Sequence, residues 1–229
     1  MSNALDLYAK VEDLLGVNEV TPKLYENYFN TLQELKFNSL LDVGCGRGEF
    51  LRQLTNLFPN VEFMGIDLSP LMVKTTQSKG IKARCIDLCK LDKKFQIITA
   101  VFDMVNYLNS KELKRFMKCI EDKLEDGGYF ICDINSLYAF KELAVGSFIR
   151  DDDNRFVTID SDFEDRIYYS EFTLFEKDGK YFKKSQESIM QYYHRVDELI
   201  KLTNLKLIDK FPFSIYGESV EKFYLVFRK

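Results

Sequence analysis

Residues 40 to 48 read Leu40-Leu41-Asp42-Val43-Gly44-Cys45-Gly46-Arg47-Gly48, and this stretch decides the fold class of the chain. An apolar run ends in an acid, three glycines follow at every second position, and apolar residues then recur at helical spacing. Glycine lets the backbone approach a ligand closely because no Cβ is in the way. A buried strand that enters a helix through such a turn is typical of the first unit of a doubly wound nucleotide-binding fold. The spacing Gly-x-Gly-x-Gly, rather than Gly-x-Gly-x-x-Gly, favours a cofactor without a pyrophosphate.

Strand and helix patterns alternate from residue 37 to residue 135. Apolar runs predict strands at Ser39–Val43, Val61–Ile66, Ile81–Ile86, Phe95–Val101 and Tyr129–Ile134. Helical periodicity predicts helices at Phe50–Phe58, Pro70–Lys79 and Ser110–Leu124. Such alternation predicts a parallel sheet with right-handed crossovers. Two further strands, Lys206–Asp209 and Phe223–Phe227, are predicted near the end of the chain.

Two segments fall outside this alternation. Residues 4–36 have the periodicity of two helices, which we interpret as a lid. Residues 155–193 are rich in aromatics and have the pattern of antiparallel strands, with a hairpin turn signal at Asp178-Gly179. We therefore divide the chain into a helical lid (1–36), a core (37–146 and 194–229) and an antiparallel β insert (147–193).

An acidic residue closes each of the five strands of the alternating region. These residues are Asp42, Asp67, Asp87, Asp103 and Asp133. Ligands of open parallel sheets bind at the carboxyl ends of the strands, so we expect these side chains to surround a ligand. A capping role is the alternative for the first four, with Asp42 holding amides of the glycine turn and the others holding the helix or turn that follows.

Two of these carboxylates suit a nucleoside. Asp67 lies 19 residues after Gly48, and an ionised carboxylate can accept from both hydroxyls of a ribose. Asp87 can accept from the exocyclic amine of adenine, with Leu88 and Phe102 on the two faces of the ring. The glycine backbone would then lie against an amino-acid-like group.

Five motifs, taken in order, resemble those of the class I S-adenosylmethionine-dependent methyltransferases. They are Asp42-x-Gly44-x-Gly46-x-Gly48, Gly65-Ile66-Asp67-Leu68-Ser69, Asp87-Leu88, Phe95-Gln96-Ile97-Ile98-Thr99-Ala100 and Leu124-x-x-Gly127-Gly128. The ordered set covers residues 37–135. The resemblance implies an α/β fold: a Rossmann-like, doubly wound seven-stranded sheet in the order 3-2-1-4-5-7-6, with strand seven antiparallel and an added antiparallel β cap.

The resemblance also implies a set of cofactor-binding residues. Gly44, Cys45 and Gly46 would line the methionine part of S-adenosylmethionine. Asp67 would bind the ribose, and Leu68 would contact the adenine. Asp87 and Leu88 would fix the adenine amine, and Phe102 would cover the ring or the sulfonium. The full set is Asp42, Gly44, Cys45, Gly46, Asp67, Leu68, Asp87, Leu88 and Phe102.

The strand-rich insert resembles that of small-molecule methyltransferases of this class, in which added strands and an N-terminal helix cover the acceptor pocket. We therefore expect the 147–193 insert to lie over the acceptor site, and O- or N-methylation of a small molecule. The Asn-Pro-Pro-Tyr motif of many amino-methylating nucleic-acid enzymes is absent after the fourth strand, which lowers the case for a DNA base. An amine, a phenol and a sugar all remain open as acceptors.

The implied mechanism is in-line displacement at the sulfonium methyl, which releases S-adenosylhomocysteine. Because the leaving group is already activated, positioning and desolvation can supply much of the rate. A general base is needed only if the acceptor must lose a proton. Asp103, Asp133 and His194 are the candidates. For Asp103 and His194 the alternative is a capping role, and His194 is alternatively a solvated residue.

Composition excludes several other classes. A net charge of −4 does not favour binding to nucleic acid. No apolar run approaches the roughly 20 residues of a membrane span. An odd count of five cysteines indicates reduced thiols. A single histidine and the lack of a second cysteine pair argue against a structural zinc site. We expect a cytoplasmic protein, either a monomer or a homodimer.

Three other functions remain open at this point. The chain could bind S-adenosylmethionine as a regulatory or partner subunit without turnover. It could also methylate RNA or protein. A nicotinamide-dependent oxidoreductase would need Gly-x-Gly-x-x-Gly, and Glu49-Phe50 follow Gly48 without the required glycine.

Overall fold

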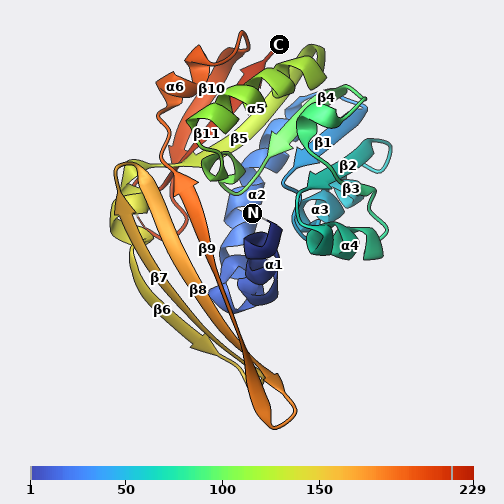
Figure 1. The fold of residues 1–229 in the computed structure, drawn as a ribbon. Helices are drawn as coiled ribbons and strands as arrows, with labels where there is room; N and C mark the ends of the chain where they lie inside the picture. Colours follow the sequence, from blue (N-terminus) through green and yellow to red (C-terminus); the bar gives the residue numbers. More distant parts are fainter. Residues whose placement is uncertain (1, 218) are drawn as a thin grey trace.

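The structure is a computed structural model that describes residues 2–217 and 219–229. Its centre is a seven-stranded sheet in the order β10-β11-β5-β4-β1-β2-β3 (Figure 1). The strands are β1 (Ser39–Val43), β2 (Glu62–Asp67), β3 (Ala83–Cys85), β4 (Phe95–Ala100), β5 (Leu124–Asn135), β10 (Lys206–Phe213) and β11 (Lys222–Arg228). Strands β1 to β5 pair in parallel, whereas β11 runs antiparallel to both β5 and β10. The predicted order and the reversed seventh strand are confirmed.

Capping residues stabilise the first turns of two of the helices that connect the strands. The connecting helices are α3 (Glu49–Leu57), α4 (Pro70–Ser78), α5 (Ser110–Lys123) and α6 (Val196–Lys201). The Ser69 hydroxyl accepts from the Met72 amide at the start of α4. Asn109 and Glu112 form a capping box at the start of α5. The predicted helices agree with these bounds to within one residue at each end.

The sheet is buried on both faces, because neighbouring residues of each strand point to opposite sides. Leu41, Ile98 and Phe130 face one apolar cluster, which α5 covers. Leu40 and Ile97 face the other, which α2 (Val17–Glu34) covers. The two clusters hold the carboxyl ends of the parallel strands at one edge of the sheet.

The insert is a separate antiparallel sheet in the order β6-β7-β8-β9. Its strands are β6 (Gly146–Asp151), β7 (Arg155–Glu164), β8 (Ile167–Asp178) and β9 (Tyr181–Tyr192). The hairpin predicted at Asp178-Gly179 joins β8 to β9. Figure 1 shows this sheet as a long ribbon that projects away from the seven-stranded sheet. The expected antiparallel β cap is therefore present as a structural unit.

The N-terminal helix α1 (Ser2–Val11) lies between the insert and the core (Figure 1). Leu7 and Val11 belong to one apolar cluster with Val157 and Leu174 of the insert. On the core side, the Asp6 carboxylate accepts a hydrogen bond from the Ser69 hydroxyl. Together with the short 3-10 helix η1 (Glu12–Leu15), α1 thus connects the two sheets.

The expectation of five reduced cysteines is wrong for two of them. Cys89 and Cys119 form a disulfide, with 5.1 Å between their Cα atoms. The bond joins η2 (Leu88–Lys90) to α5. The two residues are 30 apart in sequence and meet only because η2 packs against α5, so residue spacing gave no sign of the pair.

Two negative findings apply to residues 2–217 and 219–229. None of the helices described there is both long and apolar enough to cross a membrane. The same residues contain no group of three or more His, Cys, Asp or Glu side chains placed to hold a metal ion.

Candidate functional site

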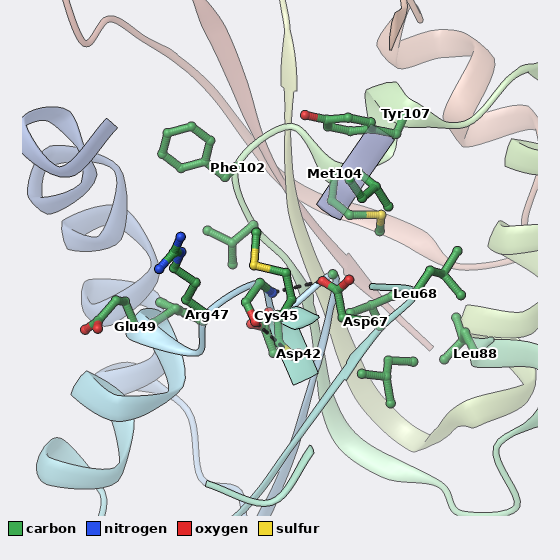
Figure 2. Close-up of a pocket in the computed structure, with 18 of the residues that line it drawn as sticks. Asp42, Cys45, Arg47, Glu49, Asp67, Leu68, Leu88, Phe102, Met104 and Tyr107 are labelled. Atoms are coloured by element: carbon green, nitrogen blue, oxygen red, sulfur yellow. Dashed lines mark hydrogen bonds between the residues drawn. The ribbon is translucent and has the colours of Figure 1, made fainter. Parts of the chain in front are cut away.

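A cavity of about 760 Å³ lies at the carboxyl ends of the parallel strands, under α1 and η1. All nine residues predicted to bind a cofactor line it: Asp42, Gly44, Cys45, Gly46, Asp67, Leu68, Asp87, Leu88 and Phe102. In Figure 2, Phe102, Met104 and Tyr107 are drawn along one wall, and Asp42, Cys45 and Asp67 lie opposite. All nine residues thus meet in one space, and their role in cofactor binding stays a prediction.

The glycine turn needs its glycines for two different reasons. Gly44, Gly46 and Gly48 have φ values of +73°, +52° and +76°, a region that other residues rarely adopt. A Cβ at Gly44 would lie 2.5 Å from Cγ of Met104. A Cβ at Gly46 would meet no protein atom within 4 Å. Gly46 therefore leaves free space beside the backbone on the cavity wall, where a ligand can approach.

Asp67 ties the glycine turn to the end of β2. Its Oδ2 accepts from the Gly46 amide at 3.0 Å, and its Oδ1 accepts from the Ser69 amide at 2.8 Å. Burial raises the pKa of this carboxyl, and the backbone amides oppose that shift. The N-cap of α4 is Ser69 rather than Asp67. The carboxylate oxygens can still accept further hydrogen bonds, as ribose hydroxyls would require.

Asp87 caps a helix, which was the alternative to its predicted role in binding adenine. Its Oδ1 accepts from the Cys89 amide at 2.8 Å and so caps η2. Nη2 of Arg115 lies 2.9 Å from the same oxygen. Arg115 also lines the cavity. Sequence reasoning missed this arginine, because on sequence alone it belongs to a basic cluster typical of a solvated helix face.

Asp42 is almost fully buried at the bottom of the cavity, with 2% of its surface exposed. Its Oδ1 accepts from the Thr99 hydroxyl at 2.7 Å. Burial raises the pKa of this carboxyl to about 7. The amides of Gly44 and Cys45 donate to the Ile66 carbonyl instead. Among the described hydrogen bonds, Asp42 therefore does not cap the glycine turn.

The helical lid contributes residues that were not predicted. Tyr8 of α1 and Glu12 of η1 line the cavity, as does Arg47 of the glycine turn. Nε of Arg47 donates to the Glu12 carboxylate at 2.9 Å, and its guanidinium also donates to the Ala9 carbonyl. Burial raises the pKa of Glu12 even though Arg47 opposes the shift. An ion pair thus joins the glycine turn to the lid.

The three residues predicted as candidates for a general base do not line this cavity. They are Asp103, Asp133 and His194. Asp103 and Asp133 are buried beneath its wall, and both contact the ammonium of Lys222. Nε2 of His194 lies 2.8 Å from the Leu108 carbonyl, and this histidine lines a separate cavity of about 350 Å³. Burial lowers the pKa of His194. A role for these residues as bases stays a prediction.

The insert contributes nothing to the cavity wall in the described part of the chain. The lining residues come from the first 116 residues, and none belongs to 146–193. Tyr8 instead contacts Phe172 of β8 edge-to-face, with 6.2 Å between the ring centroids. The structure therefore places α1 between the insert and the cavity.

Comparison with known proteins gives matches over the part of the chain that contains the glycine turn and the parallel strands. A family model described as "Methyltransferase domain" matches residues 40–128. The chain is 33% identical over 97 residues to a malonyl-[acyl-carrier protein] O-methyltransferase of Legionella pneumophila. The aligned residues cover 41% of this chain and 34% of that protein. The chain thus spans about a third of the length of this curated relative.

Solved structures match over nearly the whole chain. An S-adenosylmethionine-dependent methyltransferase from Clostridium acetobutylicum superposes with a TM-score of 0.76 at 26% identity, covering 90% of this chain and 91% of that one. The sugar N-methyltransferase KedS8 from Streptoalloteichus superposes with a TM-score of 0.72 at 19% identity, covering 90% and 87%. The second match shows a shared fold alone.

Proposed function

Because the chain belongs to the class I S-adenosylmethionine-dependent methyltransferases, we propose that it transfers a methyl group from S-adenosylmethionine to a small-molecule acceptor. The observation that carries this proposal is the meeting of all nine predicted cofactor residues in one cavity. The sequence separates these residues by up to 60 positions, yet the parallel strands bring them to a single edge.

The residues of the cavity fit the methyl donor part by part. Asp67 offers carboxylate oxygens to the ribose hydroxyls. Leu68 and Leu88 offer apolar surface to the adenine, with Asp87 beside them. The free space at Gly46 admits the methionine part close to the backbone. Arg47, the cation of the glycine turn, suits the donor's carboxylate.

In this mechanism the chain orients the reactants and excludes water. Bound S-adenosylmethionine would supply an activated methyl group, which an acceptor oxygen or nitrogen attacks in line. The glycine turn and Asp67 fix the donor end of the reaction. The lid residues Tyr8 and Glu12 close the space in which the acceptor would lie. Orientation and desolvation of this kind can account for much of the rate of such a transfer.

Several features support a small acceptor. Residues of α1 and η1 form part of the cavity wall. The net charge of −4 disfavours an extended polyanion. Similarity in fold to a sugar N-methyltransferase is compatible with an amine or hydroxyl of a small polar molecule. The insert, through its contact with α1, would support the roof of the acceptor site.

Calorimetry followed by a transfer assay tests the proposal. We expect S-adenosylmethionine and S-adenosylhomocysteine to bind and NAD not to bind. Isotope-labelled methyl groups should then appear on at least one member of a panel of small amines, phenols and amino sugars. Binding of NAD alone would contradict the proposal. Donor binding with labelled RNA or protein as the sole product would exclude the small acceptor.

A further inference from the structure

The backbone at Phe102 and Asp103, which follows β4, has an unusual conformation. The φ values are +64° and +50°, in the left-handed region that non-glycine residues rarely adopt. Such residues persist only where the surrounding structure holds them. Here the Asp133 carboxylate does so, since Oδ1 accepts from the Phe102 amide at 2.8 Å and Oδ2 from the Asp103 amide at 2.9 Å. One carboxylate thus binds two successive amides of the turn.

Lys222 of β11 contacts the carboxylates of both Asp103 and Asp133. Its Nζ lies 2.7 Å from Oδ1 of Asp103 and 2.9 Å from Oδ2 of Asp133. The same Nζ lies 5.6 Å from the centroid of the Phe102 ring. The Tyr28 hydroxyl donates to Asp133 at 2.6 Å, and Gln191 donates to Asp103 at 2.6 Å. Every carboxylate oxygen of this network has a hydrogen-bond partner.

The network is buried and contains one ammonium and two carboxyl groups. Asp133 is 0% exposed, Lys222 6% and Asp103 9%. Both carboxylates are fully engaged, and neither lines the cavity. The Phe102 ring does line it, and this ring is what the network holds in place.

We propose that Asp133 and Lys222 are positioning residues for the methyl donor. They hold the Phe102 ring so that its exposed face meets the positive sulfonium of S-adenosylmethionine. An aromatic face attracts a desolvated cation. The product, S-adenosylhomocysteine, has a neutral thioether and loses this interaction. The network therefore raises the preference of the site for the charged donor relative to the product. The inference rests on the proposed function.

The test compares the dissociation constants of S-adenosylmethionine and S-adenosylhomocysteine by calorimetry. In Phe102→Leu we expect about a tenfold loss of donor affinity and less than a threefold loss of product affinity. Phe102→Tyr keeps the ring and should keep the preference. The double variant Lys222→Met/Asp133→Asn removes the ammonium together with one carboxyl group, and should lose the preference as Phe102→Leu does.

Lys210→Met is the matched control. Its Nζ lies 4.9 Å from the ring of Phe223, which does not line the donor cavity, and we expect the preference to stay unchanged. A folded double variant, checked by its Tm, that retains the preference would overturn the positioning role. An unchanged preference in Phe102→Leu would overturn it as well, even if the double variant does not fold. Failure of the wild-type protein to bind either compound would instead contradict the proposed function.

Discussion

Nε of Arg47 donates to the Glu12 carboxylate across 2.9 Å, and this pair joins the glycine turn to η1 at the rim of the cavity. Arg47 therefore belongs both to the surface that would receive the donor and to the contact that closes the lid. A bound carboxylate would compete with Glu12 for the same guanidinium. Under the proposed function, donor binding and lid contact would be coupled through this one side chain.

Replacing Arg47 should weaken binding of the amino-acid part of the donor alone. In Arg47→Met we expect about tenfold weaker binding of S-adenosylhomocysteine, because a charge-assisted hydrogen bond contributes about 1.5–3 kcal/mol. Binding of 5′-methylthioadenosine, which lacks the carboxylate, should be unchanged. Calorimetry with both compounds measures the difference. Arg195→Met, an exposed arginine paired with Asp197, serves as control. Equal losses for both compounds would argue against this role.

Replacing Asp67 should weaken donor binding without unfolding the protein. We expect Asp67→Ala to bind S-adenosylmethionine at least tenfold more weakly, because it loses charge-assisted hydrogen bonds worth about 1.5–3 kcal/mol. Asp126→Ala, whose side chain is 98% exposed, should bind as the wild type does. Calorimetry gives both affinities. Unchanged affinity in a folded Asp67 variant would contradict the ribose-binding role.

Asp42 should make stability depend on pH in an identifiable way. Burial raises its pKa to about 7 from an ordinary value of 3.8. Between these values the folded protein keeps a proton that the unfolded chain has released. The free energy of unfolding should therefore fall as pH rises from about 4 to about 7, by at most about 1.4 kcal/mol per unit from this group, and then level off.

The variant Asp42→Asn isolates this contribution. The amide oxygen can still accept from the Thr99 hydroxyl, but the side chain no longer titrates. Urea unfolding at several pH values should show the variant gaining stability relative to the wild type up to about pH 7. A difference between the two proteins that does not change with pH would count against the raised pKa.

The Cys89–Cys119 disulfide should stabilise the oxidised protein. Closing a loop between residues 30 apart contributes about 3–4 kcal/mol through the entropy of the unfolded chain. A reductant should lower the free energy of unfolding of the wild type and leave Cys89→Ser/Cys119→Ser unchanged. Alkylation after unfolding without reductant should modify three thiols, those of Cys45, Cys85 and Cys132. Modification of all five would show that the bond does not form.

Leu174→Ala, a change in the insert, should weaken the packing of α1 against the insert. Leu174 is fully buried in the cluster shared by α1 and the insert, so its truncation should cost about 2–5 kcal/mol. We also expect faster protease cleavage within α1. Ile149→Ala, at a position 56% exposed, should leave both properties unchanged. Normal protection of α1 in a destabilised Leu174 variant would mean that the insert does not support the lid.

The sequence predicted the core well because its signals are local. The glycine turn, the alternation of strand and helix, and the acids at strand ends each lie within one short segment. Helical periodicity predicted the helix bounds, and in the structure Ser69 and Asn109 cap two of these helices. Strand order and the full set of predicted cofactor residues followed from the family resemblance, whereas the strand ends by themselves indicated only a ligand site lined by acids.

The sequence could not show contacts between distant segments. Lys222 has charged neighbours and gives no sign of its burial between Asp103 and Asp133. The sequence therefore suggested these two acids as candidates for a general base and did not show that both contact Lys222. Cys89 and Cys119 meet only after η2 packs on α5. The position of α1 beneath the insert likewise depends on two complementary apolar faces rather than on any one motif.

The shared cluster of α1 and the insert has a consequence for synthesis of the protein. Leu7 and Val11 leave the ribosome early, but their packing partners extend to Ile189. A helix of ten residues is marginally stable in water by itself. The nascent core can therefore complete its glycine turn and parallel strands while the first helix is still unanchored. The wall that α1 contributes to the cavity should therefore form only after the last strand of the insert has been synthesised.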